Sequence, residues 1–509
     1  MKALDREILR IALPSILAGI TVPLVGMVDI AVAGHLDGGA AAFIGGISVG
    51  SMLFDLLYWN FYFLRGGTGG LTAQAFGRGD RRECACLLVR SVGLALAIAL
   101  LVLSVRTPFT KLAFLAIHCT PEVRTLALKY FFLRVWAAPA TLSLMAFRGW
   151  FIGMQDSVSS MLTDLVVNGL NVALSIILAL GIGSWQGLGF AGVALGTLIA
   201  QYVGLLFAAL IVALKYGGVF EGFGGEDLRA AFRGSEIRRF FSINTDLFFR
   251  SIGITAIYIG FTMISAGLGD LTLAAGAILM KLLMLFSFIT DGFAYAGQAL
   301  VGKYIGMGSR ERTQASVRRV FVWSMAIAGA FLVIYGFGGI PLLRVMTSDG
   351  AVVEACRPFL PWLILMPPLG CAAFAWDGIY EGATASRPMR DAMLAAMVAF
   401  FALWFALKGF LPPESASVVP GDLTVMPGDL PVMPGDLPVM PGDLPVVPGD
   451  LPVMPGDLPV MPGSDRASRS TLALHFLMAA YFAHLLVRTV WLTVLYRRSV
   501  LDRPFGQPF

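Results

Sequence analysis

Long apolar runs separated by short polar connections fill nearly the whole chain. Each run reaches about 20 residues, the length with which an α-helix crosses the hydrocarbon core of a bilayer. The pattern predicts an all-α integral membrane protein with twelve transmembrane helices, six in each half of the chain. We place these helices at residues 8–33, 43–64, 85–105, 125–150, 158–183, 187–214, 239–266, 271–300, 317–341, 357–383, 389–411 and 471–496.

The two halves carry the same marker residues at a constant separation. Gly77 and Gly306 are 229 positions apart, and several other pairs share that separation. One offset that holds over much of the chain indicates a duplication, and duplicated halves are common among transporters. The sequence therefore predicts two pseudo-symmetric six-helix bundles. The further pairs are Arg10 and Arg239, Pro139 and Pro368, Gly149 and Gly378, Gly153 and Gly382, and Ser157 and Ser386.

One segment of the second half has no counterpart in the first. From Pro420 the sequence repeats PGDLPVM with a period of seven, and proline and glycine in each repeat exclude a continuous helix. We expect a disordered insertion outside the cytoplasm, with a partner-binding segment as the alternative. The predicted parts of the chain are the first lobe at 1–215, a cytoplasmic linker at 216–238, helices seven to eleven at 239–411, the insertion at 412–470, and the last helix with its tail at 471–509.

The composition excludes a soluble protein. Hydrophobic residues make up 57% of the chain and charged residues 14%, with a mean hydropathy of +0.79, whereas soluble domains carry about 25% charged residues. The five cysteines, of which only Cys84 and Cys86 are close in sequence, indicate neither a disulfide framework nor a zinc site. We expect no metal or organic cofactor.

Lysine and arginine gather in the connections on one side of the predicted helices, for example at 78–82 and 229–239. Cytoplasmic loops carry this excess, so both termini are predicted to lie in the cytoplasm. The net charge of +5 thus reflects membrane topology rather than nucleic-acid binding. We expect a multi-pass monomer in the lipid bilayer of the plasma (inner) membrane.

A small set of charged residues falls within the predicted helices. Each costs about 2.5–3.5 kcal/mol at membrane depth, and such residues usually mark a transport pathway or an internal ion pair. These deep charges are mostly acidic. They are Asp29, Asp55, Asp164, Asp246, Arg250, Lys281, Asp291, Asp377 and Glu381.

Asp29 lies fifteen residues after Pro14 in the first predicted helix, with Pro23 between them. Proline removes a backbone donor and lets a helix bend, so a carboxylate here could couple protonation to a change of shape. Asn168 and Asn171 share a face of the fifth helix. They could form hydrogen bonds to Asp29 as part of a coupling site, or they could simply hold helices together.

Asp377 and Glu381 lie four residues apart on the tenth helix and therefore share a face. Two close carboxylates cannot both ionise cheaply, so one is expected to hold a proton, or the pair a cation. Alternatively, Lys281 of the eighth helix neutralises them.

Four deep charges, Asp246, Arg250, Asp291 and Lys281, are candidates for a substrate cavity or a charge network. Asp246 and Arg250 have the same spacing of four and are expected to pair with each other. Asp291 could serve either transport or helix packing.

Two glycine-containing motifs do not fit a catalytic or nucleotide site. GISVG at 46–50 has the spacing of a nucleophile elbow, but it falls inside a predicted helix rather than at a strand-to-helix turn. GGTGG at 66–70 lacks the lysine and hydroxyl residue of a phosphate-binding loop. The sequence therefore predicts that the protein is not an enzyme.

Several stretches resemble the multidrug and toxic compound extrusion (MATE) transporters, in their DNA-damage-inducible F (DinF) branch. The resemblance covers both halves and, more loosely, the last helix. The stretches are LRIALPSI at 9–16, VDIAVAGHL at 28–36, YWNFYFLRGGTGGLTAQAFG at 58–77, INTDLFFR at 243–250, TDGFAYAGQALVGKYIG at 290–306 and WDGIYEGATASRPMRDAM at 376–393.

The resemblance implies two six-helix bundles around a central cavity, with alternating access driven by a proton or Na⁺. Pro14, Asp29 and Asn171 match family residues. Many relatives have an Asp where this chain has Ser175, which shifts weight toward Asp377. Glu381 stands where an apolar residue is commoner, and Gln298 stands where many relatives of this branch have Glu.

We therefore expect a cation-coupled antiporter that exports amphipathic organic compounds, such as cationic drugs or toxic metabolites. Asp29, Asn168 and Asn171 would form its first coupling site, and Asp377 with Glu381 its second. The alternative is a flippase for lipid-linked saccharide precursors, a relative in the wider superfamily, which would need a large cationic cavity.

Overall fold

The computed structural model describes residues 2–36, 39–117, 119–232, 234–347, 349–412 and 463–502. The PGDLPVM repeat, and with it nearly all of the predicted insertion at 412–470, lies outside these residues. Helices make up almost all of the described chain, and its only β-type pairing is an isolated bridge between Ile182 and Trp185.

The helices of the first half begin with α1, which is followed by seven helices and a short linker helix. Their bounds are α1 (Lys2–Gly34), α2 (Ala40–Tyr58), α3 (Phe63–Arg78), α4 (Arg81–Ala116), α5 (Pro121–Arg134), α6 (Ala138–Gly153), α7 (Ser157–Leu180), α8 (Phe190–Tyr216) and α9 (Gly225–Ala231). The second half contains α10 (Gly234–Ala266), α11 (Asp270–Gly306), α12 (Arg310–Met346), α13 (Gly350–Cys356), α14 (Leu360–Gly382), α15 (Ser386–Lys408) and α16 (Gly463–Tyr496).

Within the described residues, twelve helical segments are long and apolar enough to cross a membrane, which confirms the predicted number. Three of these segments combine two helices each: α2 with α3, α5 with α6, and α13 with α14. The predicted boundaries were too short in places. The glycine-rich stretch 66–70, where the second predicted helix had already ended, continues as the helix α3.

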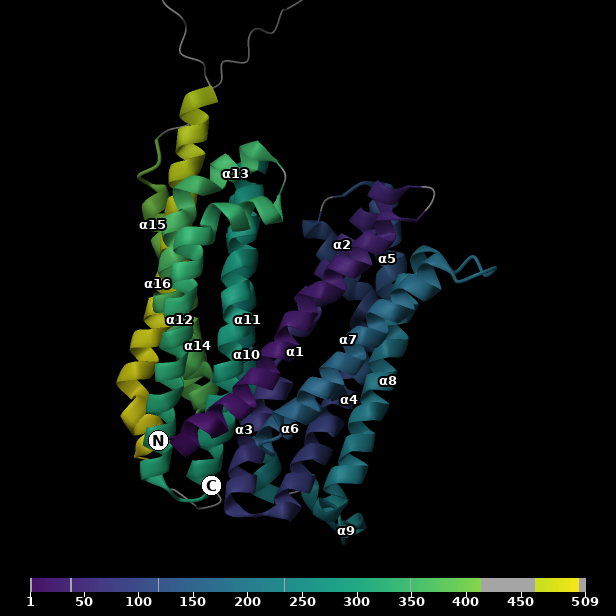
Figure 1. Cartoon of the computed structure of the whole chain (residues 1–509), viewed down its shortest axis with the longest axis vertical. Coiled ribbons are helices and arrows are strands. Elements are labelled where there is room, and N and C mark those ends of the chain that lie inside the picture. Colours follow the sequence, from purple (N-terminus) through teal and green to yellow (C-terminus); the bar gives the residue numbers. More distant parts are fainter. Residues whose placement is uncertain are drawn as a thin grey trace, which may run out of the picture.

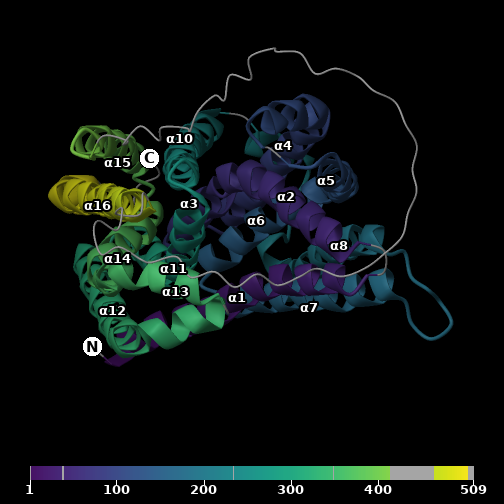
Figure 2. The same cartoon turned by 90° about the horizontal axis from the view of Figure 1, so that it is seen from above.

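The helices form two lobes that stand side by side (Figure 1). Helices α2 to α8 make one lobe and α10 to α16 the other, as the view from above also shows (Figure 2). The ribbons come together at the end where α1 begins and diverge toward the opposite end. Helix α1 runs diagonally from the foot of the second lobe to the first lobe, so it joins the two.

Pairs of glycines related by the 229-residue offset pack equivalent helices of the two lobes. A Cβ atom on Gly149 of α6 would lie 2.3 Å from the carbonyl oxygen of Arg65 on α3. Its counterpart Gly378 of α14 stands in the same relation to the carbonyl oxygen of Ala294 on α11, at 1.9 Å. Real Cβ atoms do not approach oxygen so closely, so both positions require glycine.

The same symmetry governs the contact between the lobes. A Cβ atom on Gly77 of α3 would lie 2.0 Å from the carbonyl oxygen of Lys303, and one on Gly306 would lie 2.1 Å from that of Gln74. Gly77 matches Gly306 under the offset, and Gln74 matches Lys303. The two lobes therefore meet at a pseudo-twofold axis where backbone touches backbone.

Side chains from the following turns secure this seam. Gln155 and Thr384 also match under the offset, and both adopt a positive φ, 63° and 52°. The Nε2 atom of Gln155 donates a hydrogen bond of 2.8 Å to the carbonyl oxygen of Ala299. The Nε2 atom of Gln74 donates to Thr384 Oγ1 at 3.2 Å and to the carbonyl oxygen of Gly382 at 2.9 Å.

Helix α1 remains a single helix although it contains Pro14 and Pro23. Pro14 has no N–H group, which leaves the carbonyl oxygen of Arg10 without its helical partner. The hydroxyl of Ser157, at the start of α7, donates to this oxygen at 3.0 Å. At the other face, Glu7 accepts hydrogen bonds from Lys303 at 3.1 Å and from Tyr304 at 3.0 Å. The start of α1 is thus tied to both lobes.

The substitution Gly378→Ala should destabilise the protein, because its methyl group meets the Ala294 carbonyl oxygen. Overpacking of this kind costs about 1–3 kcal/mol, and we expect a lower melting temperature in detergent. Gly329→Ala is the matched control, since this helical glycine of α12 has open space around it. The control should leave the melting temperature unchanged or raise it slightly. Equal melting temperatures for the two variants would contradict the packing argument.

Candidate functional site

A chain of polar side chains crosses the interior of the first lobe. Asp29 of α1 is buried, with 3% of its surface exposed. The Ser175 hydroxyl lies 3.1 Å from Asp29 Oδ1 and 3.1 Å from Asn171 Oδ1. The amide Nδ2 of Asn171 donates to Thr197 Oγ1 at 3.1 Å, and Thr197 donates to the carbonyl oxygen of Val193 at 3.3 Å. We call Asp29, Ser175, Asn171 and Thr197 the first-lobe relay.

The protonation state of Asp29 decides how this relay is satisfied. A serine hydroxyl has one proton to donate, yet Ser175 lies between two acceptor oxygens. When Asp29 is ionised, Ser175 can donate to the carboxylate, but the Asn171 oxygen then loses its donor. When Asp29 is protonated, it can donate to Ser175, which then donates to Asn171. When Asp29 is protonated, every residue of the first-lobe relay therefore has a hydrogen-bond partner.

Two neighbours of the relay complete the first-lobe site. Asn168, which was predicted to join the coupling site, donates instead to Thr21 Oγ1 at 2.6 Å and so links α7 to α1. Arg134, at the end of α5, donates to the Tyr130 hydroxyl at 2.6 Å and stacks over the Phe54 ring at 4.9 Å. The positive charge of Arg134 also interacts electrostatically with the carboxylate of Asp29.

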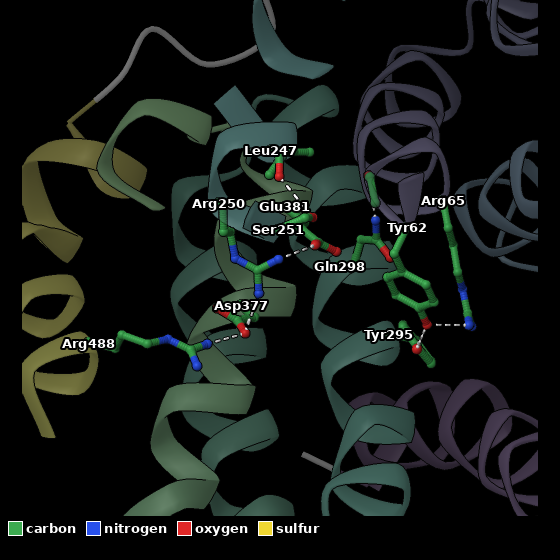
Figure 3. A network of polar contacts seen from close by, with 11 residues as sticks. Tyr62, Arg65, Leu247, Arg250, Ser251, Tyr295, Gln298, Asp377, Glu381 and Arg488 are labelled. Atoms are coloured by element: carbon green, nitrogen blue, oxygen red, sulfur yellow. Dashed lines mark hydrogen bonds and ion pairs between the residues drawn. The ribbon is translucent and has the colours of Figure 1, made fainter. Parts of the chain in front are cut away.

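The second lobe contains a compact group of charges from three helices (Figure 3). Arg250 of α10 donates to Asp377 Oδ2 of α14 at 2.5 Å, and Arg488 of α16 donates to the same oxygen. Glu381 lies farther away, 3.9 Å from Arg250. Asp377 is therefore neutralised by two arginines. Its closeness to Glu381 does not by itself require a shared proton.

Two predicted ion pairs are wrong. Lys281 does not neutralise Asp377 and Glu381, because its side chain is exposed and makes no ion pair with any described residue. Asp246 does not pair with Arg250. It binds Arg390 Nη1 at 2.6 Å and the Ser386 hydroxyl at 2.8 Å, both on α15. In each case a neighbouring helix supplies a closer partner than the spacing along one helix suggested.

The expectation that the deep charges are mostly acidic rested on an incomplete set, because four further arginines bring the deep charges to seven acidic and six basic residues. Arg65, Arg134, Arg148 and Arg488 lie within the spans and were overlooked. Arg148 pairs with Asp164 at 2.5 Å. Three of the four fall inside the predicted helices, so an inventory of both signs of charge would have found them.

Residues of both lobes meet beside the second-lobe charges. Gln298 of α11 donates to the carbonyl oxygen of Gly66 on α3 at 2.8 Å. The hydroxyl groups of Tyr62 and Tyr295 form a hydrogen bond between the lobes. Asp291, one turn before Tyr295, is half-buried and has no hydrogen bond or ion pair with any described residue. Among the described residues, no three His, Cys, Asp or Glu side chains converge to hold a metal ion.

Comparison with known proteins identifies the family to which this chain belongs. The MatE family model matches residues 14–177 and 247–405, one segment in each lobe. The chain is 34% identical over 434 residues to the DNA damage-inducible protein F of Escherichia coli (strain K12), covering 81% of this chain and 91% of that protein. It is 24% identical to a probable multidrug resistance protein NorM of Thermotoga maritima, covering 79% and 83% of the two chains.

The fold agrees with solved structures. A MATE protein in a bent conformation matches with a TM-score of 0.71, covering 97% of both chains at 15% sequence identity. These comparisons do not favour the flippase alternative over a drug-extrusion transporter. They confirm the resemblance of the sequence to the MATE transporters. The chain belongs to the MatE family, in its DNA-damage-inducible F branch, and is a multi-pass membrane transporter rather than an enzyme.

Proposed function

We propose that this protein is a proton-coupled antiporter that exports amphipathic organic compounds from the cytoplasm. The observation that carries the proposal is the first-lobe relay, in which a buried carboxylate on α1 is joined to α7 and α8 through single hydrogen bonds. The distribution of Lys and Arg favours a cytoplasmic position for both termini. The outward direction of transport is inferred from the family to which the chain belongs.

The geometry of the relay favours a proton over Na⁺ as the coupling ion. A hard cation needs several oxygen atoms that converge on one point. Here the oxygens follow one another in a line, and Asp29 is the one carboxylate among them. Ser175 replaces the second carboxylate that many relatives carry at this position. A line of hydroxyl and amide groups ending at a carboxylate is suited to accept one proton.

Helix α1 offers a way to convert that proton into a change of shape. Its first half is held to the second lobe through Glu7, and its second half meets α7 at Asp29. Pro23 leaves the carbonyl oxygen of Gly19 without a helical donor, which makes bending easier between these two attachments. Protonation of Asp29 alters only the second attachment. We propose that this change lets α1 shift relative to α7 and loosens the seam between the lobes.

The charges of the second lobe receive a different role in this proposal. Asp377 holds Arg250 and Arg488 in place, so its loss would leave two arginines with fewer partners in a low-dielectric region. We therefore assign proton coupling to the first lobe and treat the second-lobe group as the wall of the substrate pathway. The charge inventory favours neither cationic nor anionic substrates by itself.

A pH gradient, and not a Na⁺ gradient, should drive transport. We would measure uptake into proteoliposomes of two permanently charged fluorescent amphiphiles, an NBD-alkyl sulfonate and the matching NBD-alkyl trimethylammonium. An acidic lumen should accelerate uptake of at least one probe, while Asp29→Asn should lower that rate by about tenfold or more. Protein-free liposomes control for leak. Uptake that responds only to Na⁺, or full gradient-driven uptake by Asp29→Asn, would overturn the proposal.

Ser175→Ala should uncouple transport because it cuts the relay between Asp29 and Asn171. Loss of one buried hydrogen bond corresponds to about 1 kcal/mol, so we expect gradient-driven uptake to fall by roughly fivefold. Exchange of labelled for unlabelled substrate without a gradient should persist, since it needs no proton step. Asn168→Ala serves as the matched control, as it removes an α1–α7 hydrogen bond outside the relay. Equal loss of uptake and exchange in both variants would instead indicate a packing role for Ser175.

A further inference from the structure

Arg65 occupies a central position at the junction of the lobes. It is near the start of α3, directly after the turn at Trp59–Phe61 that separates α3 from α2. It lies thirteen positions before Arg78, the end of the span, a distance of about 20 Å along the axis. A guanidinium group at such depth is costly unless it serves a partner or a pathway.

Arg65 has no acidic partner in the described part of the chain. Its Nη1 atom donates to the Tyr62 hydroxyl at 2.8 Å, and its guanidinium carbon lies 3.7 Å from the centre of the Tyr295 ring. Its Nε atom is buried and has no hydrogen-bond partner. Two nearby carboxylates are occupied elsewhere: Asp164 pairs with Arg148, and Asp377 pairs with Arg250 and Arg488. Asp291 and Glu381 interact with Arg65 electrostatically, but neither forms an ion pair with it.

The surroundings of Arg65 suit an anionic amphiphile. Its guanidinium presents several N–H groups in a plane, and such a group binds the oxygens of a carboxylate, sulfonate or phosphate in a bidentate manner. Tyr62 is exposed over 41% of its surface and belongs to the first lobe, whereas Tyr295 belongs to the second. Figure 3 shows the Tyr62 hydroxyl between Arg65 and Tyr295. Aromatic faces beside the cation supply contacts for an apolar body.

We propose that Arg65, flanked by Tyr62 and Tyr295, binds an anionic group of the transported compound, so that the exported amphiphiles include organic anions. This inference rests on the proposed transport function and deepens it by naming a substrate class. Because the flanking tyrosines come from opposite lobes, a bound anion contacts both halves at once. Movement of one lobe relative to the other then changes the contacts of the substrate directly.

The sulfonate and trimethylammonium probes test this inference, because they share a fluorophore and alkyl chain and carry head groups of opposite charge. Wild-type protein should bind the sulfonate more tightly in detergent, as measured by fluorescence polarisation, and should transport it faster. Arg65→Gln should weaken sulfonate binding by about tenfold or more, the loss expected for a charge-assisted hydrogen bond, and change trimethylammonium binding less than about twofold. Arg65→Lys should retain part of the preference for the sulfonate, because lysine keeps the positive charge but lacks the planar pair of N–H donors of a guanidinium.

Arg106→Gln is the matched control. Arg106 also lies against an aromatic ring, that of Trp136 at 4.9 Å, but within the first lobe on α4. The Arg106→Gln variant should leave sulfonate binding unchanged. A wild-type preference for the trimethylammonium probe, or equal loss of both probes in Arg65→Gln, would overturn the inference. Binding in detergent needs no gradient, so a protein that binds the sulfonate through Arg65 but does not transport under any gradient would refute the transport function and not the anion site.

Discussion

Contact between helix backbones at paired glycines is the constraint on which the rest of the structure depends. Inside a bilayer there is no hydrophobic force to bring apolar helices together, so close packing through small residues must do so. The contacts of Gly77 with Lys303 and of Gly306 with Gln74 fix α3 against α11. This seam sets where Arg65, Tyr295 and Gln298 meet. The polar junction between the lobes is thus a consequence of where two glycines allow their backbones to touch.

Arginines then determine how the interior tolerates its carboxylates. Each deep arginine has a defined partner: Arg148 has Asp164, Arg250 and Arg488 have Asp377, and Arg134 and Arg65 have the hydroxyls of Tyr130 and Tyr62. Pairing lowers the cost of charge at depth, and breaking one member of such a pair leaves the other uncompensated. Asp29 differs from Asp377 because its hydrogen bond is to a neutral group, the hydroxyl of Ser175. A carboxylate with neutral partners is freer to change its protonation state than one held by two guanidinium groups.

The sequence alone predicted the number of spans, the duplication and the family, because these depend on hydrophobic length and on residue identities at a fixed offset. It also brought Pro14, Asp29 and Asn171 to attention. It could not identify Arg390 as the partner of Asp246, since α10 and α15 are neighbours only in the folded chain. The helical state of residues 66–70 was equally hidden. Glycines usually weaken a helix, and the sequence does not reveal the polar groups of Asn244, Gln298 and Glu381 that pack too closely against these glycines for any side chain to fit.

The duplicated lobes have kept their packing residues and exchanged their chemistry. The offset that relates the glycines also relates Asp29, Asn171 and Ser175 to Tyr258, Phe400 and Trp404. These three aromatics lie in or against the apolar core of the second lobe, so no second relay exists at the equivalent place. Conversely, Asp377 corresponds to Arg148, a reversal of charge. A transporter with one relay and one charged wall has a division of labour that a symmetric pair of lobes could not provide. In the proposed mechanism, protonation acts on the first lobe alone, and α1, attached to both lobes, carries its effect to the other.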